Sequence, residues 1–168
     1  MKRMTAMLSA AAVVIMAAGL LAQAKPNFSG KWTMDAPAAP AAGAPGGGGG
    51  GRGGGGGGGW GMAPTITQDA TTLKVEYMGG GQAPAPVTLT YKLDGTESKN
   101  TVQGRGGPAE QVSKAVWDGA TLKITTTTAN GDQVRVISME GAKLAISTTQ
   151  NGRDGAPATT KITYSKGM

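Results

Sequence analysis

The sequence predicts an all-β protein, an up-and-down antiparallel meander of about 8–10 strands that closes into a barrel. Segments in which apolar and polar residues alternate recur from residue 27 to the C-terminus, and this period is typical of strands with one buried face. Turn residues interrupt them about every 8 to 14 residues, and no helical period occurs after residue 24. Successive hairpins without long crossovers give an up-and-down order, and closure removes the exposed sheet edges.

The clearest hairpin covers residues 115–128. Asp118-Gly119 predicts its turn, because glycine adopts positive φ freely and aspartate does so better than most residues. The flanking segments have strand chemistry: Ala115 and Trp117 are predicted to share one face before the turn, and Leu122 and Ile124 to share one face after it. The same unit recurs along the chain, so this hairpin indicates the architecture of the whole.

Residues 1–24 have the composition of a secretory signal peptide. Two basic residues follow the initiator Met, residues 7–21 form an Ala-rich apolar run, and Ala22-Gln23-Ala24 fits the small-x-small cleavage rule. The run is shorter than the roughly 20 apolar residues that span a membrane. We therefore expect cleavage before Lys25, no integral membrane anchor afterwards, and an exported protein, periplasmic or extracellular. The chain has no cysteine, so it forms no disulfide and has no cysteine for lipid attachment.

The first strand of the barrel is predicted within residues 25–35. Phe28, Gly30, Trp32 and Met34 fall on one face at period two. Trp32 has two interpretations: a large core residue that closes one end of the fold, or a residue that contacts a ligand.

Residues 36–61 are predicted to form a disordered loop after the first strand. A Pro/Ala segment is followed by a tract that is glycine from 46 to 59 except for Arg52. Such a stretch has almost no side chains to bury and much backbone entropy to lose. One arginine is too little charge for an RNA-binding Arg-Gly-Gly segment. Trp60, at the end of the tract, either rejoins the fold or stays exposed.

Residues 62–168 are predicted to form the remainder of the barrel domain. Alternation and turn residues place the strands in this order along the chain: 65–68, 72–78, 87–93, 98–103, 110–117, 121–129, 133–139, 143–150 and 159–165.

The predicted inward face has few large apolar residues. It includes Leu73, Val75, Tyr77, Leu89, Tyr91, Val134, Val136, Leu144, Ile146, Ile162 and Tyr164. Several strands continue with the hydroxyl residues Thr126, Thr128, Ser138 and Thr148. These either line a barrel that holds water or a ligand, or face solvent near the strand ends, where Thr is a good strand residue.

The chain resembles a group of uncharacterised exported bacterial proteins with lipocalin-like (calycin-type) domains. The resemblance rests on Phe28-Ser29-Gly30-Lys31-Trp32, Leu73-Lys74-Val75, Tyr91-Lys92-Leu93-Asp94-Gly95 and Ala115-Val116-Trp117-Asp118-Gly119. It covers most of residues 27–165 and implies a lipocalin-like barrel in which the Gly-x-Trp tryptophan closes one end. The chain departs from true lipocalins in having no C-terminal helix and no arginine after the last strand, where Lys166 is the nearest basic residue.

Composition excludes several classes of function. The chain has no histidine and no cysteine, which removes the usual metal ligands, catalytic triads and thiol nucleophiles. We expect no metal site and no cofactor. The net charge of +6 falls to +4 when the predicted signal peptide leaves, and the positive residues are spaced singly. This predicts no nucleic-acid partner, which would require clustered charge.

The sequence does not predict an enzyme. A carboxylate pair is the remaining catalytic option, with Asp94 and Glu97 or Asp118 and Asp154 as formal candidates. Turn chemistry already explains these Asp-Gly positions.

The leading functional hypothesis is an exported, non-enzymatic binding module for a small apolar or amphipathic ligand. Four aromatic residues are the candidates to line its site: Trp32, Tyr77, Tyr91 and Trp117. The first alternative is a structural or interaction protein of the cell envelope with a solid barrel and an unidentified protein partner. The second is a hydrolase that uses two carboxylates.

Overall fold

A computed structural model of the chain describes residues 24–36, 59–79, 84–104, 107–129, 131–152 and 155–167. Most of the predicted signal peptide and of the predicted loop 36–61 lies outside these residues. The described part contains ten strands, as the alternation predicts: β1 (Gly30–Met34), β2 (Thr65–Gln68), β3 (Thr72–Met78), β4 (Pro86–Lys92), β5 (Glu97–Gly104), β6 (Gly107–Asp118), β7 (Thr121–Thr128), β8 (Gly131–Glu140), β9 (Lys143–Asn151) and β10 (Pro157–Lys166). No helix long and apolar enough to cross a membrane occurs among these residues.

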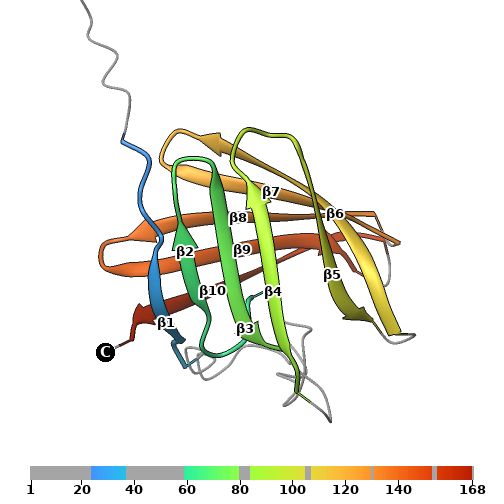
Figure 1. Cartoon of the computed structure of the whole chain (residues 1–168), viewed down its shortest axis with the longest axis horizontal. Helices are drawn as coiled ribbons and strands as arrows, with labels where there is room; N and C mark the ends of the chain where they lie inside the picture. The colour runs from blue at the N-terminus through green and yellow to red at the C-terminus, as the bar shows by residue number, and fades with distance from the viewer. Residues whose placement is uncertain are drawn as a thin grey trace, which may run out of the picture.

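The ten strands form one antiparallel sheet in the order β4-β3-β2-β1-β10-β9-β8-β7-β6-β5. Every neighbouring pair is sequential except β1 and β10, where the first and last strands join. In Figure 1, β1 to β4 stand in front of β7 to β10 and run across them, so the sheet folds back on itself. The predicted up-and-down meander is therefore confirmed, and it closes nearly into a barrel.

The β6–β7 hairpin shows how the local sequence builds this meander. Asp118 pairs with Thr121 as the last strand residue, so the loop is Gly119-Ala120, one residue later than the Asp118-Gly119 turn predicted. Gly119 has φ +59°, and no non-glycine residue in the described part of the chain has positive φ. This combination is that of a type II′ turn, which matches the twist of the two strands and favours glycine at its first position.

The seam between β4 and β5 is closed by side chains in place of a backbone ladder. The two strands are the ends of the sheet, yet Asn100 Oδ1 accepts a hydrogen bond from the Thr90 N–H (2.7 Å) and Asn100 Nδ2 donates to the Thr90 carbonyl (3.1 Å). Ser98 Oγ accepts another from the Lys92 N–H (2.8 Å). Asn100 thus takes the place of a neighbouring peptide group, and it bridges the two ends of the nearly closed barrel without strand pairing.

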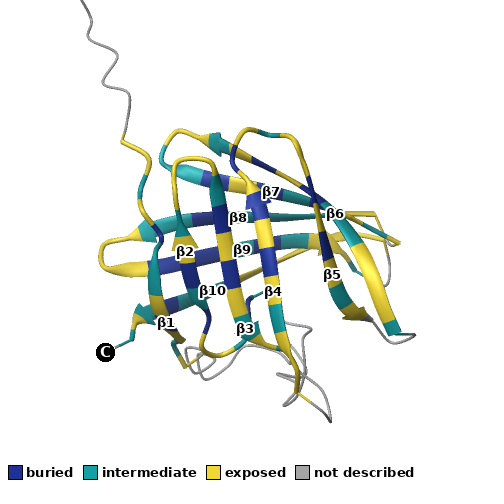
Figure 2. Cartoon of the chain, in the orientation of Figure 1, coloured by how far each residue is buried: buried dark blue, intermediate teal, exposed yellow. Residues whose placement is uncertain are grey.

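The core lies where the two parts of the sheet cross, and Figure 2 shows the buried bands of β3, β8 and β9 there. Its largest fully buried side chains include Trp60, Tyr91, Tyr164 and Phe28. Trp60 therefore rejoins the fold, which resolves the choice that the sequence left open.

The predicted orientation of β8 is wrong. Val134 and Val136 were expected to point inward, but Ile137 is fully buried and pairs with the buried Leu122 and Ile146. Since neighbours across a ladder share a face, Ile137 points inward and the two valines point outward. Arg135 has the same parity as Ile137, so it also points inward.

Asp35 joins the ends of three strands and carries a testable pH dependence. Its carboxylate accepts hydrogen bonds from Lys143 Nζ (2.8 Å) and Ser165 Oγ (2.6 Å), and these lower the pKa of Asp35 from 3.8 to about 2. The resulting stability is present above about pH 4 and is lost as the pH falls toward 2. Between pH 4 and pH 2, we expect the melting temperature of Asp35→Asn to fall by less than that of the parent.

Thermal unfolding followed by circular dichroism at pH 7, 4 and 2 measures this difference. Asp118→Asn, at an exposed hairpin position, is the matched control and should lose as much melting temperature as the parent. Equal acid sensitivity in Asp35→Asn and the parent would contradict the assignment.

Candidate functional site

The inner face of β6 to β10 changes from apolar to polar in consecutive rows across the ladder. The first row pairs Trp117, Leu122, Ile137, Ile146 and Ile162. The second row pairs Ala115, Ile124, Arg135, Thr148 and Thr160, and the third pairs Ser113, Thr126 and Gln133. We call Ser113, Thr126, Gln133, Arg135 and Thr148 the polar inner wall.

The hydroxyl groups of this wall are buried. Ser113 and Thr126 are 2% and 1% exposed and hydrogen-bond to each other through Oγ and Oγ1 (2.8 Å), and Thr148 is 2% exposed. Of the hydroxyl residues with two interpretations, Thr126 and Thr148 therefore line the interior. Ser138 has the parity of Val136 and lies on the outer face.

Arg135 acts electrostatically on all three tyrosines of the chain. Burial raises the pKa of Tyr91 to about 12 and also raises the pKa values of Tyr77 and Tyr164, while the positive charge of Arg135 opposes each rise. The three tyrosines come from β3, β4 and β10, on both sides of the fold. Their hydroxyl groups are neutral at pH 7 and can donate or accept hydrogen bonds.

Trp60 fills the interior beside these tyrosines. The Tyr164 hydroxyl accepts a hydrogen bond from the Trp60 N–H (3.1 Å) and donates one to the Gly61 carbonyl (3.1 Å), and the Tyr91 and Trp60 ring centroids are 6.4 Å apart. The indole Nε1–H reaches hydrogen-bond geometry with no described atom. A methyl group added at Gly59 would overlap the Tyr164 hydroxyl, so glycine is needed at this close approach.

The four predicted lining residues separate into two pairs. Trp32 donates a hydrogen bond from Nε1 to the Phe28 carbonyl (2.9 Å), and Trp117 stacks on the Phe28 ring (5.7 Å between centroids). Tyr77 and Tyr91 lie instead beside Gly61 and Trp60. The two tryptophans therefore belong to the packing around Phe28, and the two tyrosines adjoin the interior near Arg135.

Lys166 covers Trp32, with Nζ 5.9 Å from the ring centroid. A cation over an indole face is attracted by the ring quadrupole. Lys166, the basic residue nearest to the position where lipocalins carry an arginine, thus lies over Trp32.

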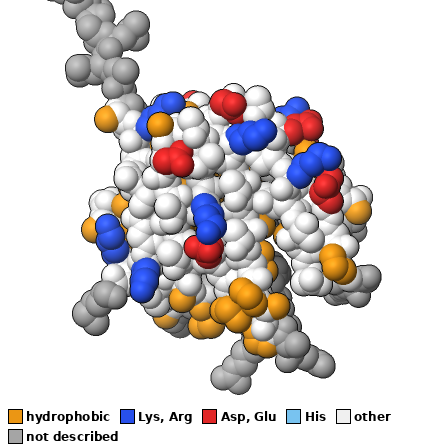
Figure 3. All heavy atoms as spheres, viewed as in Figure 1, with side chains coloured by type: hydrophobic (Ala, Val, Ile, Leu, Met, Phe, Trp, Pro, Cys, Tyr) orange, Lys and Arg blue, Asp and Glu red, His pale blue; other side chains and the backbone are white. Residues whose placement is uncertain are grey.

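The described surface is hollowed at the seam between β4 and β5 and on the outer face of the β6–β7 hairpin. Figure 3 shows the surface hollowed between the part built from β1 to β4 and the projecting part built from β5 and β6, with hydrophobic side chains at its margin. This is the seam where β4 and β5 have no backbone ladder.

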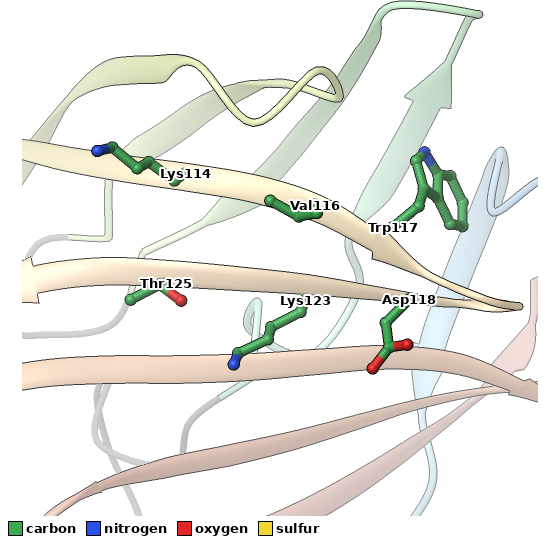
Figure 4. A pocket seen from close by; sticks show the side chains of 6 residues that line it. All are labelled: Lys114, Val116, Trp117, Asp118, Lys123 and Thr125. Atoms are coloured by element: carbon green, nitrogen blue, oxygen red, sulfur yellow. The ribbon is translucent and has the colours of Figure 1, made fainter.

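The second hollow lies on the outer face of the β6–β7 hairpin. It has a volume of about 520 Å³ and is open to solvent, and its lining residues are Lys114, Val116, Trp117, Asp118, Lys123 and Thr125 (Figure 4). Val116 is 53% exposed. Lys114 pairs with Glu97 (3.4 Å).

Of the two formal carboxylate pairs, only Asp94 and Glu97 lie wholly within the described residues, and each of them bonds to another partner. Asp94 Oδ1 accepts hydrogen bonds from the N–H and hydroxyl of Thr96 (2.9 and 2.7 Å), and these lower the pKa of Asp94. Glu97 instead forms an ion pair with Lys114 (3.4 Å between Oε1 and Nζ). Asp118 is exposed, and Asp154 lies outside the described residues. No cluster of three acidic side chains that could hold a metal ion occurs in the described ranges.

No protein-family model matches the chain, and a search of curated proteins finds no significant relative.

Sequence reasoning missed Arg135, Trp60 and Tyr164 as residues of the site. Tyr164 was assigned to the core, and its role appears only when Trp60 lies against it. The sequence does contain a signal that could have located Arg135. Arg135, Ile137 and Met139 occupy alternate positions, so an inward face that includes the two apolar residues also includes Arg135.

Proposed function

We propose that this protein is an exported, non-enzymatic binding module of lipocalin-like form, which takes a small amphipathic ligand through the hollow between β4 and β5. One observation carries the proposal. The inner face of the larger part of the sheet changes, within three rows of its ladder, from fully buried apolar residues such as Ile137 to the polar inner wall that begins at Arg135. An amphipathic molecule matches such a boundary, with its apolar part toward the core and its polar part on the wall.

Export supports the same function. The predicted signal peptide would deliver the barrel to the periplasm or the cell exterior, where a carrier or sensor of small amphipathic molecules works without a cofactor. The tyrosine hydroxyls and the wall can orient a ligand, and no reaction follows from them.

The test is a titration of the purified whole chain with the neutral fluorescent lipophile N-phenyl-1-naphthylamine. We expect a saturable rise in fluorescence. Val116→Glu, which places a charge in the outer hollow at an exposed position, is the matched control and should leave the binding curve unchanged. Loss of binding in this variant would place the lipophile on the outer face, and no saturable rise in the parent would contradict the proposal.

A second candidate is a structural or interaction protein of the cell envelope. Trp60 favours it, because this side chain is fully buried and occupies interior space between Tyr91 and Tyr164. A solid barrel of this kind would bind a protein partner on its outer face. It predicts no uptake of the lipophile, so the same titration distinguishes the two candidates.

A further inference from the structure

Arg135 differs from the other basic residues of the described chain by its place in the fold. Every described lysine side chain is exposed. Arg135 is partly buried and lies opposite Ile124 on one side and Thr148 on the other, which are 0% and 2% exposed. It therefore brings a positive charge to the inner face of the sheet.

The groups around Arg135 are suited to an anion. The wall adds neutral hydroxyl and amide groups at Thr126, Gln133 and Thr148. Tyr77 and Tyr91 add hydroxyl donors that interact with the charge of Arg135, whereas the Tyr164 hydroxyl already donates to the Gly61 carbonyl. A guanidinium carries five N–H donors in a planar fork, so it can bond to the protein and to a carboxylate, sulfonate or phosphate at once. Such charge-assisted bonds strengthen where water is partly excluded.

We propose that the ligand of this protein carries an anionic group, which Arg135 binds on the polar inner wall while the apolar part of the ligand contacts the residues around Ile137. This inference rests on the binding function proposed above and adds the class of ligand: an amphipathic carboxylate, sulfonate or phosphate ester.

The test uses two probes with the same aromatic framework. N-phenyl-1-naphthylamine is neutral, and 8-anilinonaphthalene-1-sulfonate adds one sulfonate group. We expect the parent to bind both. Arg135→Gln should weaken the sulfonate probe about tenfold or more, the typical effect of losing a charge-assisted hydrogen bond, and change the neutral probe by less than about twofold.

Lys123→Gln is the matched control. Lys123 lies on the neighbouring strand opposite Val136, on the outer face, and lines the outer hollow. The variant removes the same charge from the molecule, and we expect both probes to bind as they do to the parent. Weakening of the sulfonate probe by Lys123→Gln and not by Arg135→Gln would assign anion binding to the outer hollow and overturn the inference.

The two proposals fail in distinguishable ways. If the neutral probe binds the parent and the sulfonate probe gains nothing from Arg135, the binding module stands and the anionic ligand is wrong. If neither probe binds, both proposals are wrong. Should Arg135→Gln not fold, two measurements on the parent decide. Decanoate should displace the neutral probe at lower concentration than 1-decanol, and added salt should weaken only decanoate; equal displacement would contradict the inference.

Discussion

Replacement of Trp60 by alanine is expected to lower the free energy of unfolding by roughly 3–5 kcal/mol, the usual loss for a buried tryptophan. The side chain is 0% exposed and packs beside Tyr91, and its backbone is held by Tyr164. Removal leaves a cavity that the two parts of the sheet cannot fill without moving. Urea unfolding of the whole chain followed by circular dichroism measures the change, which corresponds to a fall in melting temperature on the order of 10 °C or more.

Two further variants make this prediction specific. Trp60→Phe keeps a ring in the interior and removes the buried Nε1–H that lacks a described partner, so we expect it to lose less than half as much stability as Trp60→Ala. Met62→Ala alters a neighbouring side chain that is 77% exposed, and it should change stability by less than about 0.5 kcal/mol. If Trp60→Ala were as mild as Met62→Ala, Trp60 would not be part of the core.

The second large effect is expected at the seam between β4 and β5. Asn100→Ala leaves the Thr90 N–H and carbonyl without their partner in a partly buried position. Each such group costs about 1–3 kcal/mol when it is buried, and partial exposure reduces the sum, so we expect a loss of about 2 kcal/mol. Hydrogen exchange at the Thr90 amide should accelerate beyond the change in global stability, because the seam opens locally.

Asn100→Asp separates the two bonds of this side chain. The carboxylate can still accept from the Thr90 N–H, but it faces the Thr90 carbonyl, to which Asn100 Nδ2 donates. This repulsion raises the pKa of the introduced carboxyl above its usual value near 3.9. Compared with the parent at each pH, the variant should therefore regain stability as the pH falls through this raised pKa toward about 4, because the protonated carboxyl can donate to the carbonyl.

Thr101→Ala is the control for both seam variants. Thr101 is exposed, lies next to Asn100 on β5 and faces away from the seam, so a loss below about 0.5 kcal/mol is expected. Unchanged exchange at the Thr90 amide in Asn100→Ala would show that the side-chain bonds do not hold β4 against β5.

These variants concern the features that local patterns did not predict. In β8, Val134 and Val136 have one parity, and Ile137 and Met139 have the other. Both faces of this segment are equally apolar when it is considered alone, and a shift of one residue exchanges them. The buried partners Ile124 and Thr148 decide the matter, because Arg135 pairs with both. The inward charge, and with it the candidate ligand site, therefore depends on the ladder.

The position of Trp60 likewise required the folded chain. The glycine tract before Trp60 has no alternation of apolar and polar residues, so the sequence does not predict whether Trp60 is buried or exposed. The Tyr164 hydroxyl fixes the backbone on both sides of it across a separation of 104 residues in the chain. Tyr77 and Tyr91 are lining candidates from the sequence; in the fold Tyr91 adjoins Trp60 and Tyr77 adjoins Gly61.

The sequence by itself determined the number, order and type of the strands, because alternation and glycine-containing turns are decided by residues close together in the chain; it placed the β6–β7 turn to within one residue. Only the tertiary structure decided which face of β8 points inward, where Trp60 lies, and how Asn100 closes the seam. Each of these depends on partners brought from distant strands or across the gap between sheet ends. The physical reason is that hydrogen-bond partners and burial are properties of the packed sheet, and a single strand does not contain them.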